Sequence, residues 1–230
     1  MAYDHFGAPI KSTEVALAAF TDNVQSVESH RFTEYAVMKP ATTLPAARVA
    51  SSSVRDPMLA ATNLASQLNH DHLGCVLFFC SAEYDLGRLG IALEHAFPGV
   101  RLCGCTSAGE ITPEGYGRGC ITAIGFDSRY FAIDCALIRE LDRFTLQDAQ
   151  GVIDGLLSTC RDAKLAPVKG NTFAITLLDG LSSREELVLA TLNAALGTIP
   201  QFGGSAGDDE RLANTHVFYD GQFHTGAATV

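Results

Sequence analysis

The stretch Cys75-Val76-Leu77-Phe78-Phe79-Cys80 is a continuous apolar run, and Thr172–Leu178 is a second segment of similar character. Strands that are buried on both faces of a sheet show such runs instead of an alternation of apolar and polar residues. Each run is followed by a polar turn, by apolar residues at helical spacing, and then by a shorter strand. The two runs therefore predict two parallel strand–helix–strand units and an α/β fold.

Further elements follow from the same periodicity. In the first half we expect a helix with Leu59, Leu64, Ala65 and Leu68 on one face, a helix over 86–97, and strands over 100–105, 120–126 and 130–138, the last two turning at Asp127-Ser128. In the second half we expect helices over 149–160 and 187–196, a strand over 199–203, and a hairpin over 216–223 that turns at Asp220-Gly221.

A repeated tripeptide suggests that the two halves are copies of one unit. Ser107-Ala-Gly109-Glu110 begins 32 positions after Cys75, and Ser205-Ala-Gly207-Asp208 begins 33 positions after Thr172. Matching motifs at matching places favour an internal duplication, with repeats at about 56–139 and 144–230. The predicted fold class is α/β, with mixed sheets from two tandem copies of a helix–strand–helix–strand–loop–hairpin unit. The alternative is that ordinary α/β alternation produces the similarity.

Residues 1–52 differ in composition from the rest, since they are rich in Ala, Thr, Ser and Pro. We interpret them as a partly flexible leader and linker or as an edge element, with the main domain at 53–230. The chain stops at Val230 inside an apolar strand, whereas a terminal strand is usually followed by a polar tail. We therefore expect a fragment of a longer protein.

The composition excludes several classes of partner. A net charge of −10 disfavours nucleic acid and anionic membrane surfaces, because both require a basic patch. No apolar run approaches the roughly 20 residues of a spanning helix, and the N-terminus lacks the pattern of a secretory signal. The seven cysteines lie mostly in apolar strands, as reduced buried thiols do, which favours a cytoplasmic protein.

The two Ser-Ala-Gly loops are the candidate ligand site. Ligands of parallel α/β sheets gather at the carboxyl ends of strands, where both loops are expected. Glycine permits close approach of the backbone, serine donates a hydrogen bond, and the acid accepts one, which suits a small polar ligand. Asp179 follows a buried strand and is not explained by capping of the next helix. The candidate residues are Ser107, Gly109, Glu110, Asp179, Ser205, Gly207, Asp208 and Asp209. Plain turns would also use these residue types.

Catalytic and metal sites are weaker interpretations. Gly203–Gly207 matches the Gly-x-Ser-x-Gly nucleophile elbow, but that motif requires a helix directly after the serine, and a hairpin is expected here. A serine hydrolase using Ser205 is therefore a minor alternative, and we expect no enzyme activity. Cys103-Gly-Cys105 lacks further ligands at the spacing of a zinc site. His70-Asp-His72 resembles a metal motif, but it lies just past a predicted helix C-terminus, where cationic or polar side chains are ordinary.

Three segments resemble the FIST N-terminal domain: Val76–Leu86, Gly104–Gly117 with Gly-Cys-Thr-Ser-Ala-Gly-Glu, and Phe202–Asp209 with Gly-Gly-Ser-Ala-Gly-Asp-Asp. The resemblance covers about residue 48 to the end and is greatest to the NosP proteins of bacteria. It implies a signal-transduction sensor, with a C-terminal FIST domain that this chain lacks. FIST domains are regarded as sensors of small molecules such as amino acids.

The resemblance to NosP also implies haem, nitric oxide as a gas ligand, and a partner histidine kinase or cyclic-di-GMP enzyme that affects biofilm formation. Haem requires an apolar pocket and an axial ligand, which is usually histidine. Our first choice of haem ligand is His216, because it opens a strand after the second loop and alternation places it on the face of Phe218. His224 and His95 are the next candidates. No family motif assigns the ligand to a particular position.

Overall fold

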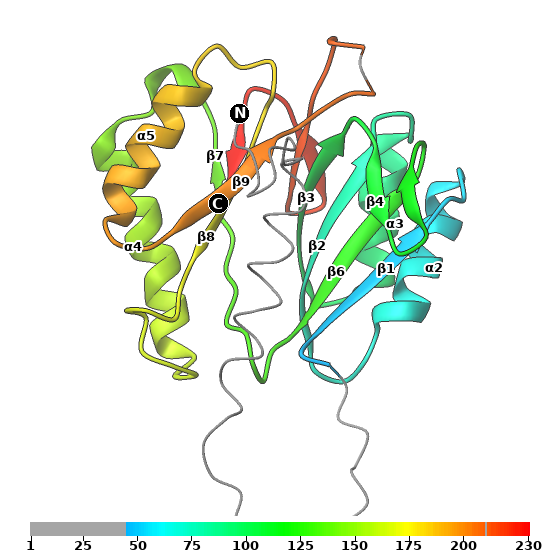
Figure 1. Cartoon of the computed structure of the whole chain (residues 1–230), viewed down its shortest axis with the longest axis horizontal. Helices are drawn as coiled ribbons and strands as arrows, with labels where there is room; N and C mark the ends of the chain where they lie inside the picture. The colour runs from blue at the N-terminus through cyan, green and yellow to red at the C-terminus, as the bar shows by residue number, and fades with distance from the viewer. Residues whose placement is uncertain (1–44, 210) are drawn as a thin grey trace, which may run out of the picture. The chain divides into compact units, whose positions relative to one another are not determined.

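The computed structural model describes residues 45–209 and 211–230 (Figure 1). Within them the chain forms a six-stranded, a four-stranded and a two-stranded sheet with four α-helices. Parallel and antiparallel pairs occur together in each of the two larger sheets. The predicted α/β class with mixed sheets is therefore confirmed.

The six-stranded sheet contains most of the first half of the chain. Its order is β1-β6-β2-β3-β10-β11, and β2 runs parallel to β3 with Ser81 opposite Ser107. The strands are β1 (Ala47–Ser52), β2 (Leu73–Ser81), β3 (Arg101–Ser107), β6 (Ile121–Asp127), β10 (Val217–Tyr219) and β11 (Gln222–His224). The predicted buried run thus lies in a central strand, with neighbours on both edges.

Two helices cover one face of this sheet, α2 (Pro57–Leu68) and α3 (Leu86–Ala96) (Figure 1). Both begin at an aspartate, since Asp56 accepts from Leu59 N at 3.0 Å and Asp85 accepts from Arg88 N at 3.0 Å. Alanines and leucines of α2 pack on the strands, but Leu59 is 57% exposed. Our placement of Leu59 on the buried face was wrong, because the packed face is centred on Ala60, Ala61 and Leu64.

The second half forms the four-stranded sheet β7-β12-β8-β9 with its own helices. Its elements are β7 (Leu137–Ile138), the 3-10 helix η1 (Leu141–Arg143), α4 (Leu146–Asp162), β8 (Ala174–Leu178), α5 (Glu185–Leu196), β9 (Gln201–Ser205) and β12 (Ala228–Thr229). Strands β8 and β9 are parallel, with Leu178 opposite Ser205. This strand–helix–strand unit matches β2–α3–β3, as the repeated motif predicted.

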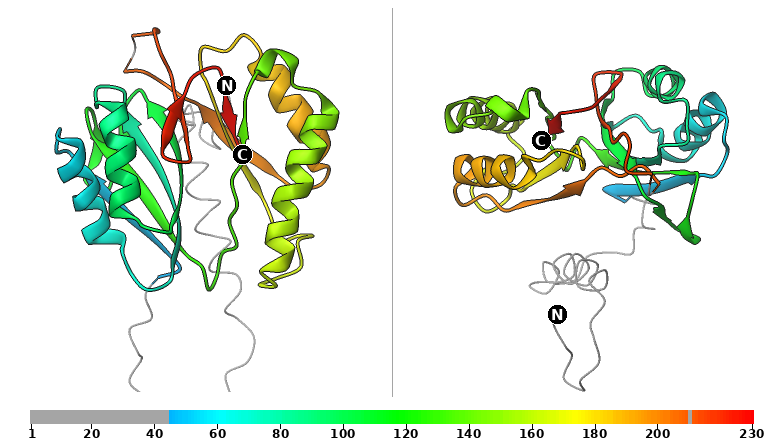
Figure 2. Two further views of the ribbon diagram at one scale, coloured as in Figure 1. Left: turned by 180° about the vertical axis from the view of Figure 1, so that it is seen from behind. Right: turned by 90° about the horizontal axis from the view of Figure 1, so that it is seen from above.

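The two sheets face each other, and the helices lie on the outer sides (Figures 1 and 2). This arrangement follows from the alternating direction of side chains along a strand. In β2, Val76, Phe78 and Cys80 pack toward α2 and α3, while Leu77 packs toward the second sheet. The cluster between the sheets consists of Leu77, Cys105, Leu177, Ala206, Val217 and Ala227. We call it the inter-sheet core.

The chain crosses between the sheets in two places, which the predicted repeats did not anticipate. The hairpin β10–β11 belongs to the second half but pairs with β3, whereas β7 belongs to the first half but pairs with β12. The predicted strand 130–138 is wrong apart from Leu137–Ile138. After β6, Arg129 donates to Asp127 and the backbone leaves the sheet, so that 130–135 connect the two sheets outside any strand. Ala136 already exchanges backbone hydrogen bonds with Val230, next to the β7–β12 pair. The duplication itself stays a prediction.

Two further segments differ from the expectations. Ala47–Ser52, which the composition assigned to the leader, is the edge strand β1 and pairs with β6. It therefore fits the second interpretation, an edge element, while residues 1–44 lie outside the described part of the chain. The polar loop after β3 contains a small hairpin, β4 (Glu110–Thr112) with β5 (Gly115–Gly117).

The cysteines agree with the expectation of free thiols, since all seven are unpaired and five of them are buried. In the region that the structure describes, no helix has the length and apolarity needed to cross a bilayer.

The crossing hairpin gives the first testable prediction. Phe218 is fully buried and contacts the rings of Phe78 and Phe223, with centroids 5.1 and 4.9 Å away. We expect Phe218→Ala to lower the free energy of unfolding by about 3–5 kcal/mol in urea denaturation, because it leaves a cavity. The control Phe202→Ala removes a ring that is 61% exposed and should cost below about 1 kcal/mol. Equal losses would contradict the packing described here.

Candidate functional site

The two Ser-Ala-Gly loops, 107–109 and 205–207, lie against each other. Each begins at the last residue of a parallel strand, Ser107 of β3 or Ser205 of β9. Gly207 N donates to the carbonyl of Thr106 at 2.9 Å. A Cβ on Gly207 would lie only 2.8 Å from Ala108 N, so this contact requires glycine. The tertiary fold thus brings together two motifs that are almost 100 residues apart.

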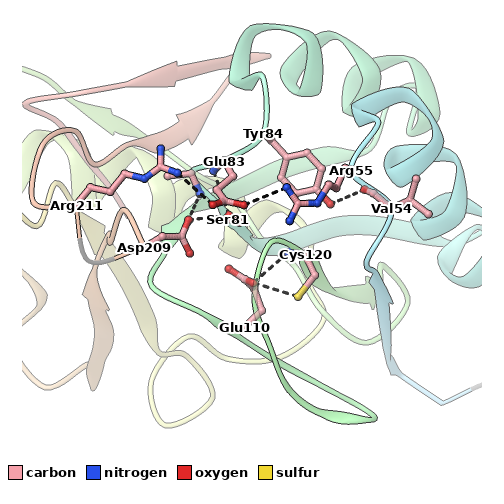
Figure 3. Close-up of polar contacts among 10 residues, drawn as sticks. Val54, Arg55, Ser81, Glu83, Tyr84, Glu110, Cys120, Asp209 and Arg211 are labelled. Atoms are coloured by element: carbon pink, nitrogen blue, oxygen red, sulfur yellow. Dashed lines mark hydrogen bonds and ion pairs between the residues drawn. The ribbon is translucent and has the colours of Figure 1, made fainter.

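Residues that follow the second loop reach the end of β2 (Figure 3). Asp209 Oδ2 accepts from Ser81 Oγ at 2.7 Å and from Ala82 N at 3.0 Å. Arg211 Nη2 lies 3.1 Å from Glu83 Oε1, and Arg55 Nη1 lies 3.5 Å from Glu83 Oε2. We call Arg55, Ser81, Glu83, Asp209 and Arg211 the junction cluster. It combines both signs of charge at the carboxyl end of a parallel strand, where ligands of α/β sheets gather.

Glu110 lies beside this cluster and is almost completely buried. Its Oε1 accepts from Ser107 Oγ at 2.9 Å and its Oε2 accepts from Cys120 Sγ at 3.1 Å. Burial raises the pKa of Glu110, and the nearby Asp209 carboxylate adds to the rise, while the hydrogen bonds from Cys120 and Ser107 oppose it. Burial also raises the pKa of Tyr84, whose hydroxyl donates to Val54 O at 2.8 Å. The region around Glu110 therefore disfavours additional negative charge.

Asp208 has a different role, although it occupies the position of Glu110 in the second motif. It is buried, and its carboxylate accepts from the backbone N of Leu212, Ala213 and Asn214 at 2.8, 2.6 and 2.9 Å. The hydrogen bonds from Ala213 and Asn214 lower the pKa of Asp208. Asp208 thus orders the segment that follows the second loop, and its oxygens are engaged by the protein.

Asp179 is also engaged by the protein. Its oxygens accept from Leu181 N at 3.0 Å, from Thr215 Oγ1 and from Gly226 N. The side chain is 7% exposed and ties together the segments on either side of the crossing hairpin. Asp179 therefore positions the backbone near the loops.

Ser205 is exposed, and its hydroxyl donates to Glu185 Oε1. A serine nucleophile requires a base such as histidine in hydrogen-bond reach and, in the elbow motif, a helix directly after it. Here Ser205 is followed by the loop that leads to Asp208. The geometry gives no support to the hydrolase alternative.

Gly109 has a backbone φ of 124°, and the Tyr116 ring fills the space that a Cβ would occupy.

The structure therefore separates the predicted residues into two groups. Ser107, Glu110 and Asp209 meet at the ends of β2 and β3, whereas Asp179 and Ser205 lie at the ends of β8 and β9. Sequence reasoning missed Arg55, Glu83 and Arg211. The sequence did contain a pattern that could have identified Glu83. It lies in Ser81–Asp85, which follows the first buried strand in the same way as Asp179 follows the second. Arg55 and Arg211 carry no pattern in the sequence.

His216 and the apolar cavity between the sheets do not together form a haem pocket. A cavity of about 220 Å³ lies between the inner face of the six-stranded sheet and α4, and no histidine lines it. His216 points to the opposite face of that sheet, where its ring lies 6.4 Å from that of Phe223. Its Nδ1 is buried without a hydrogen-bond partner, and burial lowers the pKa of the ring. The sheet thus lies between the histidine and the apolar space that haem would need.

The contact between the loops gives the second prediction. Gly207→Ala should lower the free energy of unfolding by about 1–3 kcal/mol, because the added methyl group would overlap Ala108 and force the loops apart. Gly204→Ala, three positions earlier, faces open space and should change stability by less than about 0.5 kcal/mol. Urea denaturation of both variants measures the difference. If Gly207→Ala is as stable as Gly204→Ala, the loops do not pack as described.

The third prediction concerns pH. Because the folded state lowers the pKa of Asp208, the ionised carboxylate stabilises the fold above the unfolded pKa of about 3.9, and this contribution is lost as the pH falls through the lower folded value. Asp208→Asn should therefore reduce the urea midpoint at pH 7, and the deficit should narrow below about pH 4.

The control for this experiment is Asp154→Asn, which changes an exposed side chain of α4. Its urea midpoint should follow that of the wild type at every pH. A deficit of Asp208→Asn that stays constant down to pH 3 would contradict the role of the ionised carboxylate.

Comparison with known proteins supports the family resemblance. Residues 74–230, more than half of the chain, match the model of the FIST N domain. No curated protein matches the chain. The matched region includes both Ser-Ala-Gly loops and all of the junction cluster except Arg55. The chain belongs to the FIST N domain family, a family of sensor domains in signal transduction.

Proposed function

We propose that this domain senses a small polar ligand, such as an amino acid, which binds at the junction cluster. The observation that carries this proposal is the convergence of the two loops, which brings Asp209 and Arg211 to the end of β2. Ser107 and Glu110 lie next to them. The cluster offers carboxylates for an ammonium group and guanidinium groups for a carboxylate. Such a pair of charges suits a zwitterion.

A ligand can replace one partner of an ion pair in the cluster with little loss of free energy. The side chains of Arg55 and Arg211 are 83% and 57% exposed, and that of Glu83 is 38% exposed. Exposed ion pairs contribute only about 0–1 kcal/mol, so a ligand carboxylate can replace Glu83 beside Arg211 at little cost. Asp209 is better held, because Ser81 and Ala82 both donate to it. It is therefore the anchor that we expect a ligand ammonium group to approach.

The position of the site, between the two halves of the chain, also links ligand binding to the arrangement of these halves. Glu83 belongs to the first half of the chain and Arg211 to the second, and the segments that carry them are joined through the loops. A ligand that contacts both segments stabilises the arrangement in which they lie together, because it binds this arrangement more tightly than one in which they are apart. We propose that a partner histidine kinase or cyclic-di-GMP enzyme responds to this change.

Haem-based sensing of nitric oxide is the second hypothesis, and it comes from the resemblance to NosP. One observation favours His216 as a ligand, its buried Nδ1 without a partner. The position of His216, on the far side of the sheet from the apolar cavity, speaks against it. A Soret band that forms with haem, shifts with nitric oxide and is lost in His216→Ala would favour haem over a polar ligand.

The fourth prediction tests the polar site. In a thermal-shift screen with the common amino acids, at least one should raise the melting temperature in a saturable way, equivalent to about 2.7 kcal/mol at 100 times its Kd. Asp209→Asn should abolish most of this shift, because it removes the anionic anchor.

A matched control is Asp220→Asn, because both aspartates have left-handed backbone conformations, with φ of 56° and 50°. Asp220 lies in the turn of the β10–β11 hairpin, away from the cluster. The control should keep the full shift. A screen without any stabilising amino acid, or an undiminished shift in Asp209→Asn, would refute the proposal.

A further inference from the structure

The cavity between the sheets is separate from the site proposed above. Its volume is about 220 Å³, and its walls are the inner face of β2, β3 and β6, the connection 130–135, α4 and β8. Most of its lining is apolar and includes Leu77, Phe126, Ile153, Leu157, Ile175 and Leu177. None of Arg55, Ser81, Glu83, Asp209 and Arg211 lines it. Ligands of the two sites would therefore not compete directly.

Four thiols contribute to the cavity wall, those of Cys75, Cys103, Cys135 and Cys160. The hydrogen bond with Cys103, together with burial, raises the pKa of Cys135, and burial raises that of Cys160. These two thiols are therefore neutral at physiological pH and behave as small, polarisable apolar groups.

The carboxylate of Asp134, also in the wall, is paired with a cation. Asp134 Oδ1 lies 3.0 Å from Arg101 Nη2 and accepts from Cys135 N at 2.9 Å. A charged ligand would lose its hydration in this cavity and find no free counter-charge at Asp134. The lining thus selects for a neutral occupant.

We propose that the cavity is a second binding site, which takes a neutral apolar molecule of about nine non-hydrogen atoms. The size follows from comparison with an engineered cavity of about 150 Å³, lined by Leu, Ile and Phe, which binds benzene. A space of about 220 Å³ accommodates a correspondingly larger molecule, such as a substituted benzene or a small bicyclic aromatic. The ligand would contact both β2 and β8, and so it would stabilise the packing of the two sheets.

Indole is a suitable probe because the chain contains no tryptophan, so indole emission can be excited with little background from the protein. Indole should show a saturable blue shift of its emission when the wild-type protein is added. Propylbenzene, which is neutral and of similar size, should displace it. Benzoate has the same number of non-hydrogen atoms but is charged, and it should compete at least tenfold more weakly.

The variant Cys160→Phe should weaken indole binding at least tenfold, because the ring would fill the cavity from α4. Its control Ser158→Phe adds the same ring at an exposed position of the same helix and should bind as the wild type does. Circular dichroism confirms that both variants fold, and the competition experiment stands on wild-type protein alone. Asp209→Asn should also bind indole normally, which separates this site from the polar one.

The proposal is overturned if wild-type protein gives no saturable shift, or if benzoate competes as well as propylbenzene. It is also overturned if a folded Cys160→Phe binds indole with unchanged affinity.

Discussion

The structure depends on an exchange of strands between its two sheets. The hairpin β10–β11 leaves the second half and hydrogen-bonds to β3, and the chain then returns as β12 to pair with β8. Backbone hydrogen bonds thus attach the hairpin to the first sheet and β12 to the second. The two sheets therefore cannot separate without breaking a ladder of hydrogen bonds. The inter-sheet core packs between them, beside the apolar cavity. The contact between the two Ser-Ala-Gly loops and the position of Asp209 both follow from this arrangement.

The acidic residues that follow the two Ser-Ala-Gly motifs have opposite electrostatic roles. Glu110 is buried among hydroxyl and thiol donors, and its pKa is raised, whereas Asp208 accepts several backbone hydrogen bonds, and its pKa is lowered. Asp209 has no acidic counterpart in the first motif, where Ile111 follows Glu110. Since Asp209 is the residue that reaches the end of β2, the difference between the two motifs, and not their similarity, creates the junction cluster.

The sequence predicted local structure best where one physical effect dominated. Continuous apolar runs located β2 and β8, and helical periodicity located α3 and α4. Prediction failed over 130–135, because these residues line the cavity between the sheets and form no strand, and periodicity cannot distinguish a partly buried connection from a strand. The candidate site was predicted in part. The loops were found from their motif, but Arg55 and Arg211 come from segments without a pattern, and only the fold places them beside Glu83.

By itself the sequence determined the α/β class, the family, the free thiols and the location of both loops at strand ends, since each depends on residue types within a short window. Only the tertiary structure decided that the loops touch, that Asp208 and Asp179 are engaged by the backbone, and that His216 and the apolar cavity lie on opposite faces of one sheet. The reason is that such relations depend on which strands pair across long separations. Pairing is set by the packing of both sheets together, and no local pattern encodes it.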